Sequence, residues 1–401
     1  MKVLLILEAT LGGTGRHIVD LAGGLLDRGM EVHFIYSTRR ADQQFLSGLA
    51  SLRAGHPGFH CHAISITREV TPSDISAYFE LSRYVRDRGP FDVIHAHSTK
   101  AGFLTRLLLN RSQARMVYTP HGLMTLNPEL TGARRLAVCA LESMLARRTD
   151  VVVAVSDAER RCTEQTRIDA SKLLVIPNGI RQVPRELQLK ARASIRDSLG
   201  LPSNSVCIGF VGRFIAYKKP ERVIEAFALL KRRTAVNVQL AMIGGGPLEM
   251  DLRDAVSRLG IEDSVRFLGE VDGPMYMSAF DVLAHASSFE AFSYVFVEAL
   301  SSGVPIVTTR VGGTDELISD GVTGYVCDPW DPSTFANYLQ LLVEDPQRRA
   351  AMSVAARERA AGYSVTKMVD SVVELYRHLS SHSEVNPVAS ANYQTLAGNP
   401  K

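Results

Sequence analysis

The stretch VLLILEATLGGTGRHIVDLAGGLLDRGMEVHFIY, residues 3–36, decides the fold class of this chain. Residues 3–7 are a continuous apolar run, typical of a parallel strand that is covered on both faces. A loop with glycines follows, and Gly29 ends the helical pattern after it. The apolar residues at helical spacing are Ile18, Leu21, Ala22 and Leu25. Residues 32–36 are a second apolar run, so the stretch predicts a strand, a helix and another strand.

The same alternation continues along the chain and starts again near residue 206. In the first half, we expect further strands at residues 93–95, 116–118, 151–155 and 173–176. In the second half, we expect strands at residues 206–211, 238–243, 265–268, 282–284, 304–308 and 325–326. Because strands that alternate with helices imply a doubly wound parallel sheet, the sequence predicts an α/β protein with two Rossmann-like halves.

Turn residues mark the junction between the halves. Pro-Asn-Gly at 177–179 follows a predicted strand, so we expect one domain at 1–178 and a second at 179–363. Residues 364–379 carry apolar side chains at helical spacing, which predicts an amphipathic helix that packs back on the first domain. The polar tail, residues 380–401, is expected to be disordered.

The composition excludes several classes of protein. A chain of 401 residues fits two domains, and a net charge of +3 gives no reason to expect a nucleic-acid partner. The five cysteines are scattered without a CxxC spacing, which indicates neither disulfides nor a zinc site and fits the cytoplasm. No apolar run approaches the roughly 18 residues that a membrane-spanning helix needs.

The segment EAFSYVFVE, from Glu290 to Glu298, carries the strongest functional signal. It follows a predicted strand, and ligands of open α/β sheets bind beyond the carboxyl ends of strands. The free N–H groups of Ser293, Tyr294 and Val295 at the start of the next helix would attract an anion. In a continuous helix the two carboxylates would lie about 12 Å apart, enough to reach from a sugar across a pyrophosphate to a ribose. The spacing alone fits two unrelated glutamates better, one capping a helix and one on its solvated face.

These residues resemble the Glu-x7-Glu hallmark of glycosyltransferase family 4, and other motifs occur in the order of that family. They lie at residues 11–17, 92–97, 119–122, 211–214 with Lys218, 243–248, 302–307, 311–318 and 320–324. The resemblance covers most of the chain. It implies a GT-B fold, with two Rossmann-like domains facing across a cleft, and a hexosyltransferase that retains anomeric configuration.

The resemblance also implies roles for residues of the second domain. Glu298 would hold the ribose of a nucleotide-sugar donor, and Glu290 would contact the transferred sugar. Arg213 and Lys218 would neutralise the diphosphate, since fixed cations aimed at developing charge are effective catalytic groups. The other donor-binding candidates are Phe292, Ser293 and Tyr294. Without the resemblance, Arg213 and Lys218 fit an ordinary pair on a basic surface equally well.

In the first domain the candidates are glycines and histidines. Glycines after the first strand let the backbone approach a ligand, with Gly13 on the donor side and Gly12 on the acceptor side. The resemblance places His121 near the reacting sugar, so His121 and Glu290 are the catalytic candidates and His97 is an acceptor-side candidate. His121 alone would be more simply a loop histidine. His95 and His97 are spaced for a metal pair, but no third ligand is evident, so no metal is expected.

The expected substrates follow from the resemblance. The donor is expected to be a UDP-, GDP- or ADP-sugar and no cofactor is expected. The chain has no Asp-x-Asp motif, which, with Arg213 and Lys218, favours metal-independent catalysis. The acceptor is expected to be a glycan or lipid-linked glycan of polysaccharide biosynthesis. Where the family commonly has glycine, this chain has Ala291, Ser293 and Lys219, which bears mainly on which sugar fits.

A basic stretch raises the question of a membrane. Residues 106–167 carry many arginines, which would bind the anionic inner face of a membrane if they shared one face, although a solvated helix face explains them as well. Three other functions remain: a sugar-nucleotide epimerase, a noncatalytic sugar-nucleotide-binding protein and a nicotinamide-dependent oxidoreductase. The last is disfavoured because the fingerprint starting at Gly13 lacks its third glycine.

Overall fold

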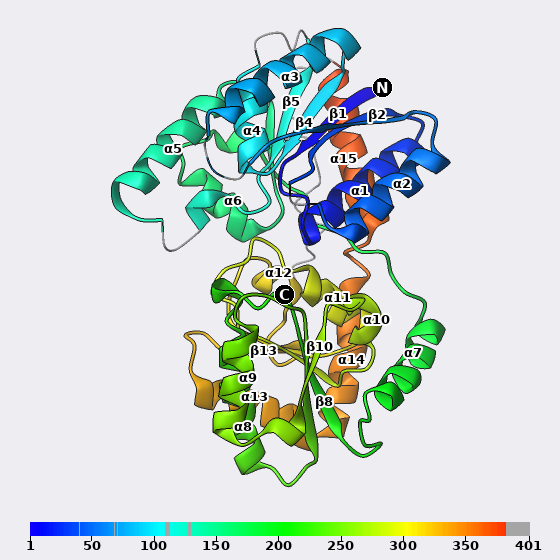
Figure 1. The fold of residues 1–401 in the computed structure, drawn as a ribbon, viewed down its shortest axis with the longest axis vertical. Helices are drawn as coiled ribbons and strands as arrows, with labels where there is room; N and C mark the ends of the chain where they lie inside the picture. The colour runs from blue at the N-terminus through cyan, green and yellow to red at the C-terminus, as the bar shows by residue number, and fades with distance from the viewer. Residues whose placement is uncertain (40, 68, 70, 109–112, 127–129, 382–401) are drawn as a thin grey trace. The chain divides into compact units, whose positions relative to one another are not determined.

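The structure is a computed structural model that describes residues 1–39, 41–67, 69, 71–108, 113–126 and 130–381. The chain forms two compact units, one made of Met1–Gly179 with Val365–Lys401 and the other of Ile180–Ser364. Each unit is a parallel sheet with helices on its faces (Figure 1). The tail predicted to be disordered lies outside the described residues from position 382 onward.

The first unit contains a seven-stranded parallel sheet with the order β3-β2-β1-β4-β5-β6-β7. Its strands are β1 (Lys2–Leu7), β2 (Glu31–Ser37), β3 (Phe59–Ile64), β4 (Val93–His97), β5 (Arg115–Thr119), β6 (Val151–Ala154) and β7 (Leu173–Val175). The strand order reverses between β1 and β4, where Leu7 lies opposite His97. Such a switch point, at the carboxyl ends of the strands, is where open α/β sheets bind ligands.

The helices of the first unit cover both faces of this sheet. They are α1 (Gly13–Asp27), α2 (Gln43–Gly55), α3 (Ser73–Arg88), α4 (Thr99–Arg106), α5 (Gly132–Ala146), α6 (Asp157–Glu164) and α15 (Val365–Ser380). The last helix returns to this unit and packs beside α1, where Val369 and Tyr376 join the core. A Cβ added at Gly24 would come within 2.6 Å of Val369, so the small residue on α1 lets the two helices approach closely.

The second unit contains a six-stranded parallel sheet with the order β10-β9-β8-β11-β12-β13. Its strands are β8 (Val206–Val211), β9 (Val238–Ile243), β10 (Val265–Gly269), β11 (Val282–His285), β12 (Ile306–Thr308) and β13 (Gly324–Val326). Its helices are α7 (Arg185–Ser198), α8 (Pro220–Arg233), α9 (Glu249–Leu259), α10 (Gly273–Met277), α11 (Tyr294–Ser302), α12 (Thr314–Leu317), α13 (Pro332–Glu344) and α14 (Pro346–Ala360). One core of apolar side chains joins α8 and α13 to this sheet.

The predicted strands all lie within observed ones or overlap them, but β3 was missed. Its sequence, FHCHAI, places His60 and His62 at alternating, partly exposed positions, so it lacks the apolar run by which buried strands were recognised. It lies at the edge of the sheet, where four of its six side chains are partly or fully exposed on the faces of the sheet, so polar side chains cost little. Among the described helices, none is both long and apolar enough to cross a bilayer.

Candidate functional site

Glu290 lies in the loop between β11 and α11. Of the segment from Glu290 to Glu298, only the part from Tyr294 onward is helical. Because α11 begins at Tyr294, the continuous helix from Glu290 to Glu298 assumed for the 12 Å separation is wrong. Gly312 explains the irregular backbone, since its N–H donates to the carbonyl of Glu290 at 3.1 Å. A Cβ at Gly312 would lie 2.4 Å from the carbonyl oxygens of Glu290 and Ala291, so the two loops touch through their backbones.

Glu290 lies at the centre of a polar network. Its carboxylate forms an ion pair with Lys218 and accepts a hydrogen bond of 3.2 Å from the hydroxyl of Ser287. His285, fully buried at the end of β11, places its Nε2 3.4 Å from the same carboxylate oxygen. The network connects residues 72 positions apart in the sequence.

This network decides the charge of Glu290. Burial would raise the pKa of its carboxyl, but Lys218 and His285 outweigh burial and lower the pKa to about 2. Glu290 is therefore a carboxylate at neutral pH, able to accept hydrogen bonds and unable to serve as a general acid. Sequence reasoning missed His285 and Ser287, although His285 ends a strand just as the flagged His97 does.

Arg213 and Lys218 lie on the segment that follows β8. The exposed guanidinium of Arg213 donates to the hydroxyl of Tyr217 at 3.1 Å. A Cβ at Gly244, after β9, would lie 2.1 Å from the carbonyl oxygen of Gly212, so the loops that leave two neighbouring strands lie in direct contact. Lys219 has φ +49° and ψ +46°, a left-handed conformation that explains why glycine is favoured there.

The start of α11 offers hydrogen-bond donors. Ser293 is its N-cap residue, and its buried hydroxyl has no hydrogen-bond partner among the described residues. Tyr294 opens the helix and Glu298, which is buried, follows one turn later. Phe292 is also buried and packs 6.1 Å from the ring of Tyr363, so it shapes the loop more than it offers a surface to a ligand.

Four histidines gather at the carboxyl edge of the first unit's sheet, near the switch point. His97 Nδ1 and His121 Nε2 share a hydrogen bond of 3.0 Å. The ring of His17, from α1, lies 4.5 Å from that of His121. The two nitrogens of His95 instead contact the hydroxyls of Tyr376 at 2.6 Å and Thr119 at 2.8 Å, so His95 connects α15 to the sheet.

The sequence showed no third ligand beside His95 and His97, but the structure brings His97 together with two other histidines, His17 from α1 and His121 from the loop after β5. Ligand atoms of His17, His97 and His121 lie within 4.8 Å of one another. Burial lowers the pKa of His17 to about 4 and those of the other two well below their usual value, so all three are neutral at neutral pH. They are chemically able to bind a metal, which would have to displace the His97–His121 hydrogen bond.

The loops around these histidines have unusual backbones. Ser98 and His121 follow β4 and β5 with φ of +76° and +53°, values that are uncommon for non-glycine residues and cluster at functional sites. Gly12, with φ +67°, caps α1, which begins at Gly13, and donates to Asp42 at 3.2 Å.

Glu159, which the sequence analysis did not single out, holds the loop that carries His121. Its buried carboxylate accepts hydrogen bonds from the N–H groups of Gly122, Leu123 and Val155 at 2.6, 3.0 and 2.8 Å. Burial raises the pKa of this carboxyl, and the three donors oppose the rise. A side chain that satisfies three backbone N–H groups fixes the course of the loop, so Glu159 is a positioning residue for His121.

Comparison with known proteins agrees with both halves of this description. Residues 11–182 match the family model described as Glycosyltransferase Family 4, and residues 191–359 match the one described as Glycosyl transferases group 1. The fold and the site define a GT-B glycosyltransferase with two parallel-sheet units. The chain belongs to glycosyltransferase family 4.

Relatives and solved structures share nearly the whole chain. The D-inositol 3-phosphate glycosyltransferase of Corynebacterium urealyticum is 29% identical over 401 residues, which cover 94% of this chain and 93% of that protein. The crystal structure of Anabaena Alr3699/HepE in complex with UDP and glucose has a TM-score of 0.78 at 24% identity and covers 94% of this chain and 100% of that one. WaaG, a glycosyltransferase involved in lipopolysaccharide biosynthesis, has a TM-score of 0.72 at 18% identity and covers 94% and 99%.

Proposed function

We propose that this protein transfers a sugar from a UDP-sugar to an acceptor hydroxyl, and that its second unit binds the donor. The observation that carries this is the network of Lys218, Glu290, Ser287 and His285, beside the N-terminus of α11. A diphosphate would draw Lys218 away from Glu290 and accept hydrogen bonds from the N–H groups at the start of the helix. The freed carboxylate of Glu290 would then accept hydrogen bonds from hydroxyls of the sugar. Glu298 would bind the ribose. The complexes of Anabaena HepE with UDP and UDP-glucose support UDP as the nucleotide.

The proposed transfer retains anomeric configuration and uses no metal. The bond between the anomeric carbon and the phosphate oxygen breaks while the acceptor oxygen forms its bond on the same face. The departing phosphate takes the acceptor proton. In this reaction Glu290 accepts hydrogen bonds from hydroxyls of the sugar and no covalent nucleophile is needed, while Lys218, drawn from its pair with Glu290, and Arg213 supply positive charge at the phosphates. A product with inverted anomeric configuration, read by NMR, would refute retention. Activity that EDTA removes and Mg²⁺ restores would refute the proposal that no metal is used.

The donor and the reaction type are tested together. UDP-, GDP- and ADP-glucose are compared by thermal shift, where a donor in large excess over its Kd adds a few kcal/mol of stability. We expect UDP-glucose to stabilise the protein most and Lys218→Ala to remove that stabilisation. Nucleotide release that requires an acceptor supports transfer. Epimer formation without an acceptor would instead identify an epimerase, and binding without turnover a noncatalytic protein.

The proposed acceptor is a glycan or lipid-linked glycan of a polysaccharide pathway. The involvement of WaaG in lipopolysaccharide biosynthesis is consistent with such a class, whereas the names of the curated relatives favour a cyclitol phosphate as a second candidate. Incubation with UDP-glucose and each acceptor class, followed by mass spectrometry of the product, separates the two.

The proposed peripheral contact with an anionic membrane needs a correction, because not every described arginine of residues 106–167 can reach a membrane surface. Arg106 is fully buried, ion-paired with Glu142 at 2.8 Å. Arg135, Arg148 and Arg160 are bonded to neighbouring residues.

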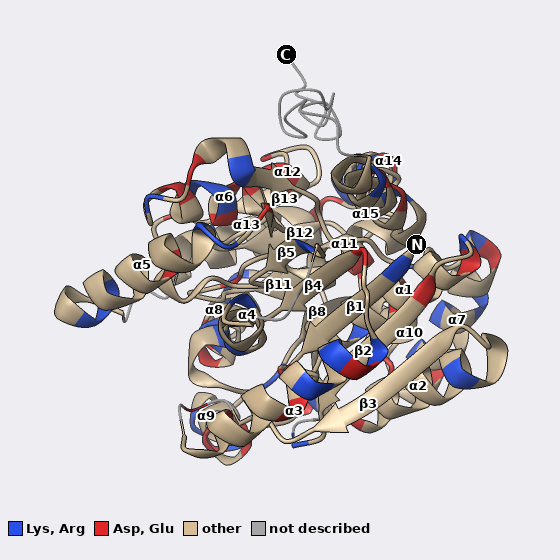
Figure 2. Ribbon diagram, turned by 90° about the horizontal axis from the view of Figure 1, so that it is seen from above, with Lys and Arg blue, Asp and Glu red and all other residues tan. Residues whose placement is uncertain are grey.

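The outer face of α5 is the better candidate. It is apolar: Leu136 is 72% and Met144 52% exposed, and the alanines between them are exposed as well. Figures 1 and 2 show α5 extending away from its own sheet, with few charges along it. An exposed apolar helix face with arginines at its ends fits the interfacial region of a membrane.

This contact is tested by flotation with vesicles of phosphatidylcholine, with or without phosphatidylglycerol. Leu136→Glu with Met144→Glu is expected to abolish binding to the anionic vesicles. Met250→Glu, at a methionine of α9 that is 69% exposed, is the control and is expected to leave binding unchanged. Equal binding by all three proteins would refute the contact.

A further inference from the structure

A cavity of about 250 Å³ lies within the second unit, between α7 and α14. Its floor is formed by the turns that lead into β11 and β12, which include Asp281 and Gly303. It therefore lies at the amino ends of these strands, whereas Glu290 follows the carboxyl end of β11. The cavity is thus separate from the candidate donor site.

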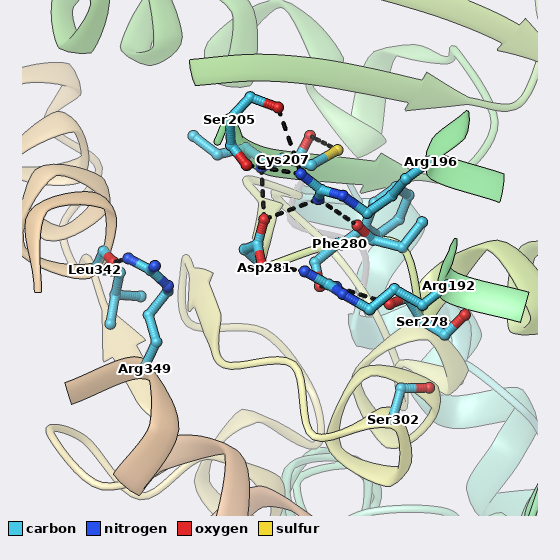
Figure 3. A network of polar contacts seen from close by, with 12 residues as sticks. Arg192, Arg196, Ser205, Cys207, Ser278, Phe280, Asp281, Ser302, Leu342 and Arg349 are labelled. Atoms are coloured by element: carbon cyan, nitrogen blue, oxygen red, sulfur yellow. Dashed lines mark hydrogen bonds and ion pairs between the residues drawn. The ribbon is translucent and has the colours of Figure 1, made fainter. Parts of the chain in front are cut away.

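Arginines dominate the lining of this cavity. Four of them, Arg185, Arg192, Arg349 and Arg357, line it together with one carboxylate, that of Asp281. Arg192 already bonds to this carboxylate at 2.5 Å, and Arg196 bonds to its other oxygen at 3.1 Å (Figure 3). The negative charge of Asp281 is therefore already compensated by Arg192 and Arg196.

The other three arginines lack a counter-charge. No carboxylate in the described part of the chain pairs with Arg185, Arg349 or Arg357. Arg349 donates to the carbonyl of Val343 at 2.8 Å and Arg357 to that of Ser302 at 3.0 Å, and neutral carbonyls leave both charges uncompensated. Like charges held around one cavity favour the entry of an anion.

Arg357 shows that the space is shaped around guanidinium groups. Its Nε is buried without a hydrogen-bond partner among the described residues. A Cβ at Gly303 would lie 2.2 Å from its guanidinium carbon, so this group lies directly against the glycine. Burial, and to a lesser extent the charge of Arg185, lower the pKa of Arg357.

The helix α7 leaves the cavity open on one side. Gln188 is its only buried residue, so arginine contacts such as those of Arg192 to the carbonyls of Ser278 and Phe280, at 2.9 and 3.0 Å, hold it in place. The side chain of Arg185, at the start of α7, is exposed and makes no hydrogen bond among the described residues. It is free to turn toward a ligand.

We propose that this cavity is a second anion site, which binds a small molecule bearing a phosphate or diphosphate group through Arg185, Arg349 and Arg357. Guanidinium groups are the preferred partners of phosphate because they donate two parallel hydrogen bonds. The volume accommodates a diphosphate. The site does not depend on the proposed donor chemistry, since no residue of the two sites is shared.

The test is a calorimetric titration of the full chain with inorganic pyrophosphate. A two-site isotherm is expected, because Lys218 and the N-terminus of α11 offer the other site. The double variant Arg185→Gln with Arg357→Gln should weaken pyrophosphate binding in one phase about tenfold or more. It should leave the other phase, which Lys218→Ala removes, unchanged. Lys190→Gln removes a positive charge from an exposed position of α7 that does not line the cavity, and it should change neither phase.

Arg185→Gln alone keeps the proposal testable if the double variant does not fold, since this side chain makes no contact that the fold needs. It should weaken the same phase about threefold or more. A single phase that Lys218→Ala removes completely would overturn the proposal. So would equal weakening by Lys190→Gln and Arg185→Gln, because general surface charge would then explain the binding.

Discussion

Replacing Glu290 with glutamine should remove a pH dependence from the stability of the second unit. A pKa lowered from 4.5 to about 2 corresponds to about 3 kcal/mol of stability, because the folded state binds the proton less readily than the unfolded one. A depressed pKa stabilises the fold above the unfolded value and loses this effect as the pH falls toward the folded value. About 2 kcal/mol of it is therefore lost between pH 6 and pH 3.

The assay is urea unfolding followed by the fluorescence of Trp330, the only tryptophan of the chain, which lies in the second unit. The free energy of unfolding of the wild type minus that of Glu290→Gln should fall by about 2 kcal/mol from pH 6 to pH 3. Glu225→Gln, at an exposed carboxylate of α8 in the same unit, is the control and should give a constant difference. A constant difference for Glu290→Gln as well would refute the coupling of Glu290 to Lys218 and His285.

Three further predictions concern backbone strain, loop positioning and a buried ion pair. Lys219→Gly should be neutral or stabilising by up to about 1 kcal/mol in the Trp330 assay, since glycine accepts the positive φ, and a loss above about 1 kcal/mol would contradict this. Glu159→Gln should lower kcat but leave the Kd of the donor unchanged, because the amide replaces only part of the hydrogen bonding behind His121; a weaker donor Kd with unchanged kcat would count against this role. Arg106→Met should cost about 3–5 kcal/mol by circular dichroism, and adding Glu142→Leu should restore part of it, since the single change leaves a buried charge unpaired. No restoration would argue against a direct ion pair.

The sequence indicated the architecture because the decisive signals are local. Runs such as residues 3–7 and 206–211 are short, apolar and followed by glycines, which is typical of buried strands that lead into loops. The strand β3 was missed because His60 and His62 alternate with other residues on the partly exposed faces of an edge strand, so it has no apolar run. The order of strands in each sheet was not predicted, since it depends on how the crossover helices pack.

The candidate donor residues were found one by one from motifs, but not their mutual contacts. The sequence by itself predicted two α/β units and offered the carboxylates Glu290 and Glu298 and the cations Arg213 and Lys218 as candidates. Only the tertiary structure decided that Lys218 pairs with Glu290 beside His285, because β8 and β11 are neighbours in the sheet although far apart in the chain. The same holds for His17, which reaches His97 through the β1–β4 pairing. Periodicity records which face of an element is buried, whereas contacts between side chains depend on distances in space that only the packed sheets set.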